Sequence, residues 1–202
     1  MKYGIIIGSH RNQSQSAKVA GYAQKSLTAM NSSSQFYTVD LSKKPLPLWD
    51  DGVWSGDEAW KSVWGPIAAE LKTCDAFVVM APEYAGMVPA ALKNFFLLAG
   101  RDELGHKPGL IVGVSSGLGG SYPVAELRMS SYKNSRLNWI PDHLIVRHAE
   151  KVLNGDVSQS DEDTFIRSRF DYCLRLLEQY GKALAIVRGS GVVDYKNHPN
   201  GL

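Results

Sequence analysis

Five apolar runs alternate along the chain with longer segments of helical periodicity. Four of these runs are nearly continuous stretches of Val, Ile, Leu and Phe, which is typical of strands covered on both faces. The second run alternates more between apolar and polar positions, and it therefore predicts an edge strand. The predicted strands are Tyr3–Ile7, Gln35–Val39, Ala76–Met80, Gly109–Val114 and His143–Val146.

Apolar residues spaced three and four positions apart predict helices in the intervals between these strands. A Gly65-Pro66 step inside one of them predicts that this helix is kinked or split in two. The predicted helices are Ser16–Met30, Asp57–Lys72, Pro89–Leu98, Pro123–Tyr132 and Asp161–Leu184. Strands and helices in alternation predict an α/β fold, in which helices cover both faces of a parallel sheet.

Composition and charge exclude several classes of protein. The 202 residues, of which 44% are hydrophobic, are enough to build a sizeable core. Because 22 basic side chains nearly balance 20 acidic ones, nothing favours binding to nucleic acid or to an anionic membrane. No apolar run reaches the about 20 residues that span a bilayer, and we expect no signal peptide. We interpret Cys74 and Cys173 as reduced thiols, and we expect a cytoplasmic protein.

The segment between the first predicted strand and its helix, Gly8–Ser16, carries polar groups that suit a phosphate. A strand, a turn and a helix in this order direct the free N–H groups of the helix at a ligand in the turn. Arg11 can donate to two phosphate oxygens, and the hydroxyls of Ser9, Ser14 and Ser16 can donate to others. The segment lacks the glycine patterns of dinucleotide and triphosphate sites, which favours a terminal monophosphate. An ordinary polar loop with a solvated arginine is the alternative.

Two further loops are expected at the same edge of the sheet, because ligands of open parallel sheets bind outside the carboxyl ends of the strands. Ala81–Pro89 follows the third predicted strand and leads directly into a helix. Ser115–Ser121 follows the fourth strand, and its glycines leave backbone N–H groups uncovered for the close approach of a flat ligand. Taken singly, these loops could also be a helix entry with a packed tyrosine and a simple glycine-rich turn.

Together the three loops resemble the motifs of the NAD(P)H-dependent FMN reductases, a family of flavodoxin-like proteins that includes quinone, azo-dye and chromate reductases. The first loop is similar to the family's Gly-Ser-x-Arg-x-x-Ser-x-Asn/Ser, and the second to its Pro-Glu-Tyr-Asn and Pro-x-x-Leu-Lys-Asn. The third is similar to Ser-x-Gly-x-x-Gly-Gly. The residues that match the first two loops are Ser9, Arg11, Ser14, Ser16, Pro82, Glu83, Tyr84, Pro89, Leu92, Lys93 and Asn94.

The resemblance implies a flavodoxin-like three-layer sandwich with a five-stranded parallel sheet in the order 2-1-3-4-5. We expect the FMN-binding domain at residues 1–187, and a polar tail at 188–202 that is either disordered or clasped to a partner subunit. The implied activity is hydride transfer from NADPH or NADH through bound FMN to a quinone, an azo compound, a metal oxyanion or free flavin. Such reductases generally work as homodimers or homotetramers.

The residues implied to bind FMN come from all three loops. The first loop would hold the phosphate, the second would line the isoalloxazine ring, and the third would approach the other edge of the ring or the ribityl chain. The implied residues are Ser9, Arg11, Ser14, Gln15, Ser16, Pro82, Glu83, Tyr84, Ala85, Ser116, Gly117 and Gly119. We expect no metal ligand and no catalytic side chain, because hydride transfer takes place at N5 of the flavin. Glu83 is therefore expected to fix the geometry of its loop.

Two features depart from the family pattern, and two other functions stay open. Ala85 stands where the family has Asn, and the insert Ala85–Val88 reshapes the pocket over the ring. An electron carrier like flavodoxin is one alternative, although flavodoxins are usually strongly acidic and this chain is not. A flavin-free binding or regulatory protein is the other, because a fold alone does not determine a function.

Overall fold

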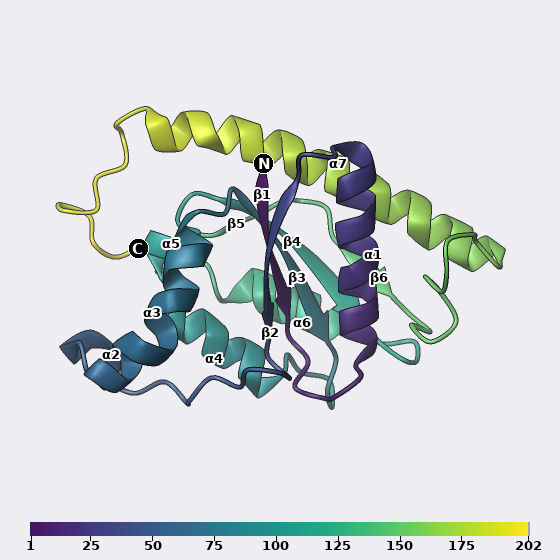
Figure 1. The fold of residues 1–202 in the computed structure, drawn as a ribbon, viewed down its shortest axis with the longest axis horizontal. Helices are drawn as coiled ribbons and strands as arrows, with labels where there is room; N and C mark the ends of the chain where they lie inside the picture. The colour runs from purple at the N-terminus through teal and green to yellow at the C-terminus, as the bar shows by residue number, and fades with distance from the viewer. Residues whose placement is uncertain (202) are drawn as a thin grey trace.

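The computed structural model describes residues 1–201, and their strands form one parallel sheet (Figure 1). The strands are β1 (Lys2–Ile7), β2 (Gln35–Asp40), β3 (Ala76–Pro82), β4 (Pro108–Val114), β5 (Asn138–Trp139) and β6 (Leu144–Val146). Five of them follow the order β2-β1-β3-β4-β5, and β6 also pairs with β4. Every pairing is parallel. The predicted strand order and the edge position of the second strand are confirmed.

The far edge of the sheet differs from the predicted five strands. The sequence predicts one strand at His143–Val146, whereas this edge consists of two short strands. β5 pairs with Pro108 and Gly109 at the start of β4, and β6 pairs with Val112–Val114 at its end. Pro141 lies between the two short strands. Because proline has no N–H to donate to a strand ladder, the edge is interrupted there.

The helices agree with the prediction in position but not at every end. They are α1 (Gln15–Met30), α2 (Gly52–Ser55), α3 (Glu58–Lys72), α4 (Ala90–Leu98), α5 (Arg101–Leu104), α6 (Ser121–Met129) and α7 (Asp161–Gly189). The sequence did not predict the short helices α2 and α5. α3 continues through Pro66, so the predicted split does not occur. α7 runs to Gly189, beyond its predicted end at Leu184; Leu202 lies outside the described residues.

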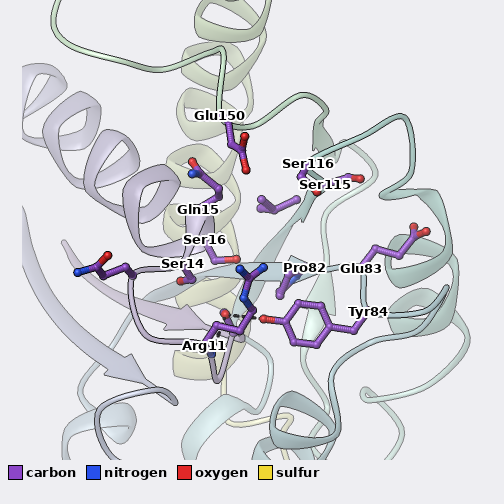
Figure 2. Close-up of a pocket in the computed structure, with 13 residues that line it drawn as sticks. Arg11, Ser14, Gln15, Ser16, Pro82, Glu83, Tyr84, Ser115, Ser116 and Glu150 are labelled. Carbon is purple, nitrogen blue, oxygen red and sulfur yellow. Dashed lines mark hydrogen bonds between the residues drawn. The ribbon is translucent and has the colours of Figure 1, made fainter.

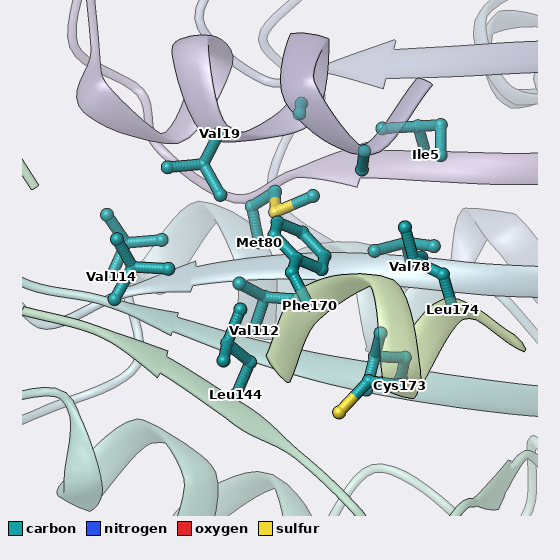
Figure 3. Close-up of a cluster of buried hydrophobic side chains, with 14 of the residues drawn as sticks. Ile5, Val19, Val78, Met80, Val112, Val114, Leu144, Phe170, Cys173 and Leu174 are labelled. Carbon is teal, nitrogen blue, oxygen red and sulfur yellow. The ribbon is translucent and has the colours of Figure 1, made fainter. Parts of the chain in front are cut away.

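Alternate side chains of the central strands point into two cores, one on each face of the sheet. On one face, Ile5, Val78 and Val112 pack against Val19 of α1 and Phe170 of α7 (Figure 3). On the other face, the neighbouring residues of the same strands pack against α3, α4 and α6. Large members of this second core are Ile6, Val79, Ile111, Trp64, Phe95 and Leu127. The helices thus form the two outer layers of the predicted sandwich.

The C-terminal tail, as far as residue 201, packs on its own chain beside α5 (Figure 1). Arg101 and Arg136 donate to the backbone carbonyls of Pro199 and His198. The guanidinium carbons of the same two arginines each lie 5.1 Å from the centre of the Tyr195 ring. The tail thus packs against its own chain, and the expected clasp on a partner subunit stays a prediction.

The two cysteines do not form a disulfide bond with each other. Cys74 and Cys173 are both buried and free, which agrees with the interpretation of reduced thiols. Burial raises the pKa of the Cys74 thiol to about 11, so this thiol is protonated at neutral pH. Among the described residues, no helix combines the length and apolar character that crossing a membrane requires.

Candidate functional site

Three loops meet at the carboxyl edge of the sheet and enclose a cavity of about 240 Å³ (Figure 2). They follow β1, β3 and β4, which are neighbours in the sheet. The residues that line the cavity are Ser9, Arg11, Gln13, Ser14, Gln15, Ser16, Pro82, Glu83, Tyr84, Val114, Ser115, Ser116 and Glu150. The parallel sheet therefore brings together three polar segments that lie far apart in the sequence.

The first loop forms the wall of the cavity at the start of α1. Ser14 is the N-cap of α1, because its side-chain oxygen accepts a hydrogen bond from Ala17 N at 3.1 Å. Ser16, in the first turn of the helix, is almost completely buried. The first N–H groups of a helix have no partner inside the helix, and its N-terminus carries partial positive charge. This wall therefore favours an anion.

Arg11 adds a full positive charge to this wall. Its guanidinium points into the cavity (Figure 2) and has no hydrogen-bond or ion-pair partner among residues 1–201. The loop that carries it is held in place because Arg11 N donates to Ser9 Oγ at 3.2 Å. Ser9 Oγ in turn lies 2.7 Å from Tyr84 Oη, which joins the first loop to the second. An unpaired guanidinium beside free helix N–H groups is the arrangement that binds phosphate.

Hydrogen-bond acceptors form a second wall. Gln15 Oε1 is buried and has no partner among the described residues, and the Glu150 carboxylate faces the same space (Figure 2). Lys18 of α1 holds the segment of Glu150, because its ammonium donates to Ala149 O, to Val152 O at 2.8 Å and to Asn154 Oδ1 at 2.8 Å. Burial lowers the pKa of this ammonium. Two free acceptors at one end of the cavity suit a ligand that donates, such as a polyol.

The second loop is a tight turn that follows the last residue of β3. The backbones of Tyr84 and Met87 exchange two hydrogen bonds of 3.0 Å, and Val88 N donates to Glu126 Oε2 at 2.7 Å. Ala85, at the tip of the turn, has a φ of +49°. This left-handed conformation is adopted mainly by Gly and Asn. The exposed side chain of Ala85 does not line the cavity.

The third loop is fixed against the second by Glu83. Glu83 Oε2 accepts a hydrogen bond from Gly120 N, and a Cβ on Gly119 would lie 2.6 Å from Glu83 Oε1. Because Gly119 has no Cβ, the Glu83 carboxylate can lie against it while it accepts the hydrogen bond from Gly120 N. The hydrogen bond of Glu83 agrees with the expected role of this residue in loop geometry.

The cavity includes most of the residues proposed from the sequence and some that were missed. Ala85, Gly117 and Gly119 lie in the expected loops but outside the lining residues. The structure adds Gln13, Val114, Ser115 and Glu150. Glu150 follows the last strand, so the rule that ligands bind at the carboxyl ends of parallel strands could have indicated it. No sequence motif marked it.

Fold and cavity together define a flavodoxin-like α/β protein with an unpaired arginine beside a helix start at the carboxyl edge of its sheet. The chain belongs to the NADPH-dependent FMN reductase family, whose sequence model matches residues 1–151. The predicted family is therefore confirmed, and with it the class of enzyme, an NAD(P)H-dependent reductase that uses FMN.

Individual relatives agree with this assignment. A 2-hydroxy-1,4-benzoquinone reductase of Burkholderia sp is 27% identical over 179 residues, which cover 85% of this chain and 93% of that protein. An NAD(P)H-dependent FMN reductase of Saccharomyces cerevisiae is 31% identical over 136 residues, or 60% of this chain and 68% of that protein. A solved NAD(P)H:(acceptor) oxidoreductase, the flavoenzyme FerB of Paracoccus denitrificans, superposes with a TM-score of 0.69 at 21% identity. The superposition covers 89% of this chain and 98% of that one, and it shows the shared fold.

The residues of the cavity fit FMN. The monophosphate matches the wall of Arg11, the serine hydroxyls and the start of α1. The ribityl hydroxyls are donors, and the buried, unpartnered Gln15 Oε1 is an acceptor in the same cavity. Because both the phosphate and the ribityl chain find complementary groups, the fit does not depend on the family assignment alone.

Proposed function

We propose that this reductase binds FMN non-covalently in the cavity at the carboxyl edge of its sheet. The observation that carries the proposal is the unpaired Arg11 guanidinium beside the N-terminus of α1. Bound FMN supplies the hydride-accepting chemistry that the protein side chains lack. The chain's own contribution is to bind and orient the cofactor and to leave one face of it open to both substrates.

We assign roles to the residues according to the wall on which they lie. The phosphate would be held by Ser9, Arg11, Ser14 and Ser16, and Gln15 would accept from the ribityl chain. The ring would lie against Pro82–Ala85, with the third loop at its edge. Tyr84 would contribute to both the ring site and the phosphate site, because its hydroxyl is hydrogen-bonded to Ser9 in the first loop. Gly117 and Gly119 do not line the cavity, and we propose that their backbone atoms approach the edge of the ring.

The acceptor that we propose is a flat, apolar small molecule, with a quinone as the first candidate. Two relatives are named as quinone reductases, in Burkholderia sp and in Pseudomonas putida. Around the proposed ring site, Met87, Leu118 and Tyr122 are exposed by 52%, 75% and 68% of their surface. Such apolar side chains favour a planar organic acceptor over a metal oxyanion, and azo compounds and free flavin share this property.

We further propose that the protein is a cytoplasmic homodimer or homotetramer. Leu97 on α4 and Met129 on α6 are exposed by 64% and 79%, and both border one groove between the two helices. Apolar side chains of this size that are exposed together mark an interaction surface more often than a solvated one. Sedimentation of the purified protein measures its state directly.

Anaerobic rapid mixing of the FMN-loaded protein with NADPH, and separately with NADH, tests the proposed function. We expect the visible flavin absorbance to disappear with at least one nicotinamide and to return when a quinone is added. A protein that binds FMN but is bleached by neither nicotinamide would support the electron carrier instead. A protein that takes up no added FMN would support the flavin-free alternative.

A further inference from the structure

Arg147, the residue after β6, binds the third loop through its side chain. Arg147 Nε donates to Leu118 O at 2.6 Å and to Gly119 O at 3.2 Å, and its Nη2 donates to Ser121 Oγ at 3.3 Å. The guanidinium therefore fixes the loop at two carbonyls and at the first residue of α6. None of the sequence motifs indicated this residue.

The backbone that follows Arg147 occupies two further carbonyls of the same loop. His148 N donates to Gly117 O at 3.1 Å, and Ala149 N donates to Ser115 O at 3.0 Å. Arg147, His148 and Ala149 thus bond four carbonyls of the third loop from one side. These four acceptors are used inside the protein.

Three backbone donors of the third loop are unused. Among residues 1–201, no hydrogen bond is found for the N–H groups of Ser116, Leu118 and Gly119. The N–H groups of the other loop residues Ser115, Gly117 and Gly120 donate to Val146 O, Ser115 Oγ and Glu83 Oε2. Ser116 lines the cavity. With four of its carbonyls occupied, the loop offers a ligand the free N–H groups of Ser116, Leu118 and Gly119.

We propose that Arg147 is a positioning residue that sets both the affinity and the reduction potential of the bound flavin. This inference rests on the proposed function, because it takes FMN as the ligand. The pyrimidine edge of a flavin consists mainly of acceptors and gains negative charge on reduction. A loop of N–H donors backed by a guanidinium stabilises this charge, and it therefore makes the flavin easier to reduce.

The charge of Arg147 and its bonds to the loop predict separable effects. Arg147→Met removes both the charge and the hydrogen bonds, so it should weaken FMN binding and shift the midpoint potential to more negative values. Arg147→Lys keeps the charge but cannot reproduce the forked contact, so it should weaken binding and leave the potential nearly unchanged. A purely structural role would lower the stability of the protein without moving the potential.

A matched control is available at the other end of α6. Arg128 Nη2 donates to the carbonyls of Ile140 and Pro141 at 2.9 and 2.8 Å, so it makes the same kind of contact away from the third loop. Arg128→Met should cost stability and change neither the affinity for FMN nor its potential.

The experiment is an FMN titration and a spectroscopic redox titration of the wild type, R147M, R147K and R128M. We expect the dissociation constant to rise at least fivefold in R147M and about twofold to fivefold in R147K. A negative shift of the potential is expected only in R147M. If R147M does not fold, an R147K dissociation constant equal to that of the wild type overturns the proposal. Unchanged affinity and potential in R147M also overturn it, whereas a wild type that binds no FMN overturns the proposed function as well.

Discussion

The two ends of the sheet use their polar groups in opposite ways. At the carboxyl end, Arg11 has no partner among the described residues, Gln15 Oε1 is buried without one, and the third loop leaves N–H groups free. At the amino end, Lys107 is buried, and its ammonium donates to three backbone carbonyls. These belong to Leu71, Lys72 and Glu103, at 3.1, 2.8 and 2.7 Å.

The charged groups around Lys107 also have partners within the chain. Arg188 donates to His106 O at 2.9 Å, and the guanidinium groups of Arg101 and Arg136 both contact the ring of Tyr195. One polar atom in this region, Arg136 Nε, is buried without a hydrogen-bond partner. The guanidinium that contains it nevertheless lies over the ring of Tyr195. Polar groups satisfied internally stabilise a fold, whereas unsatisfied ones that converge on a cavity indicate a ligand. The polar groups at the amino end therefore stabilise the fold, and those at the carboxyl end are the ones that the proposed FMN site would use.

The largest effect is expected at the amino end. Lys107→Met leaves three carbonyls without their donor, and we expect the free energy of unfolding to fall by about 3 kcal/mol. The affinity for FMN should not change, because the cavity lies at the opposite edge. Denaturant unfolding and FMN titration measure the two quantities, with the exposed Lys44→Met as the control. A large loss of FMN affinity in a folded variant would contradict the division between the two ends.

Arg11→Ala should have the reverse profile. A charge-assisted hydrogen bond is worth about 1.5–3 kcal/mol, so we expect FMN to bind at least tenfold more weakly. The unfolding of the FMN-free protein should be unaffected, because the guanidinium has no partner there. Arg175→Ala, which removes an exposed arginine of α7, serves as the control. An affinity equal to that of the wild type would show that the first loop does not hold the phosphate.

The pH dependence of stability gives a smaller, independent test of the amino end. Burial lowers the pKa of Lys107 from 10.5 to about 8 in the folded protein. Between these two values the unfolded chain binds more protons than the folded one, so stability should rise with pH across this window. We expect a gain on the order of 1 kcal/mol between pH 8 and pH 10 relative to Lys107→Met. Equal pH profiles of the two proteins would contradict this.

The smallest effect is expected in the tail. Tyr195→Ala removes the ring that two guanidinium groups contact, and exposed cation–π contacts contribute about 0.5–1 kcal/mol each. We expect a loss of stability of about 1 kcal/mol and no change in FMN affinity. Thermal unfolding of this variant beside Tyr195→Phe, which keeps a ring, separates the contribution of the ring. A Phe variant as unstable as the Ala variant would exclude the cation–π contact as the cause.

The sequence predicted those parts of the molecule that depend on local pattern. Apolar runs such as Ala76–Met80 identify buried strands, and Ser14 and Arg11 belong to a motif within one loop. The strand order came from the family resemblance and is confirmed. The interruption at Pro141 was visible in the sequence, but its consequence depends on which strand lies at the edge.

Contacts between distant segments could not be predicted in this way. Glu150 reaches the cavity because Lys18, on another element, binds the segment that carries it. Arg147 meets the third loop only after β6 has paired with β4. The contacts of Tyr195 with Arg101 and Arg136 join the tail to residues about a third of the chain or more away. Each depends on tertiary packing, for which a single sequence has no periodic signal.

The most direct test of the account is a titration of the FMN-free protein with FMN and with riboflavin, which lacks only the phosphate. If the Arg11 wall holds the phosphate, FMN should bind at least tenfold more tightly than riboflavin, and Arg11→Ala should remove most of that preference. Equal affinities of the wild type for FMN and riboflavin would contradict the central claim that the carboxyl end of the sheet is a phosphate-anchored flavin site.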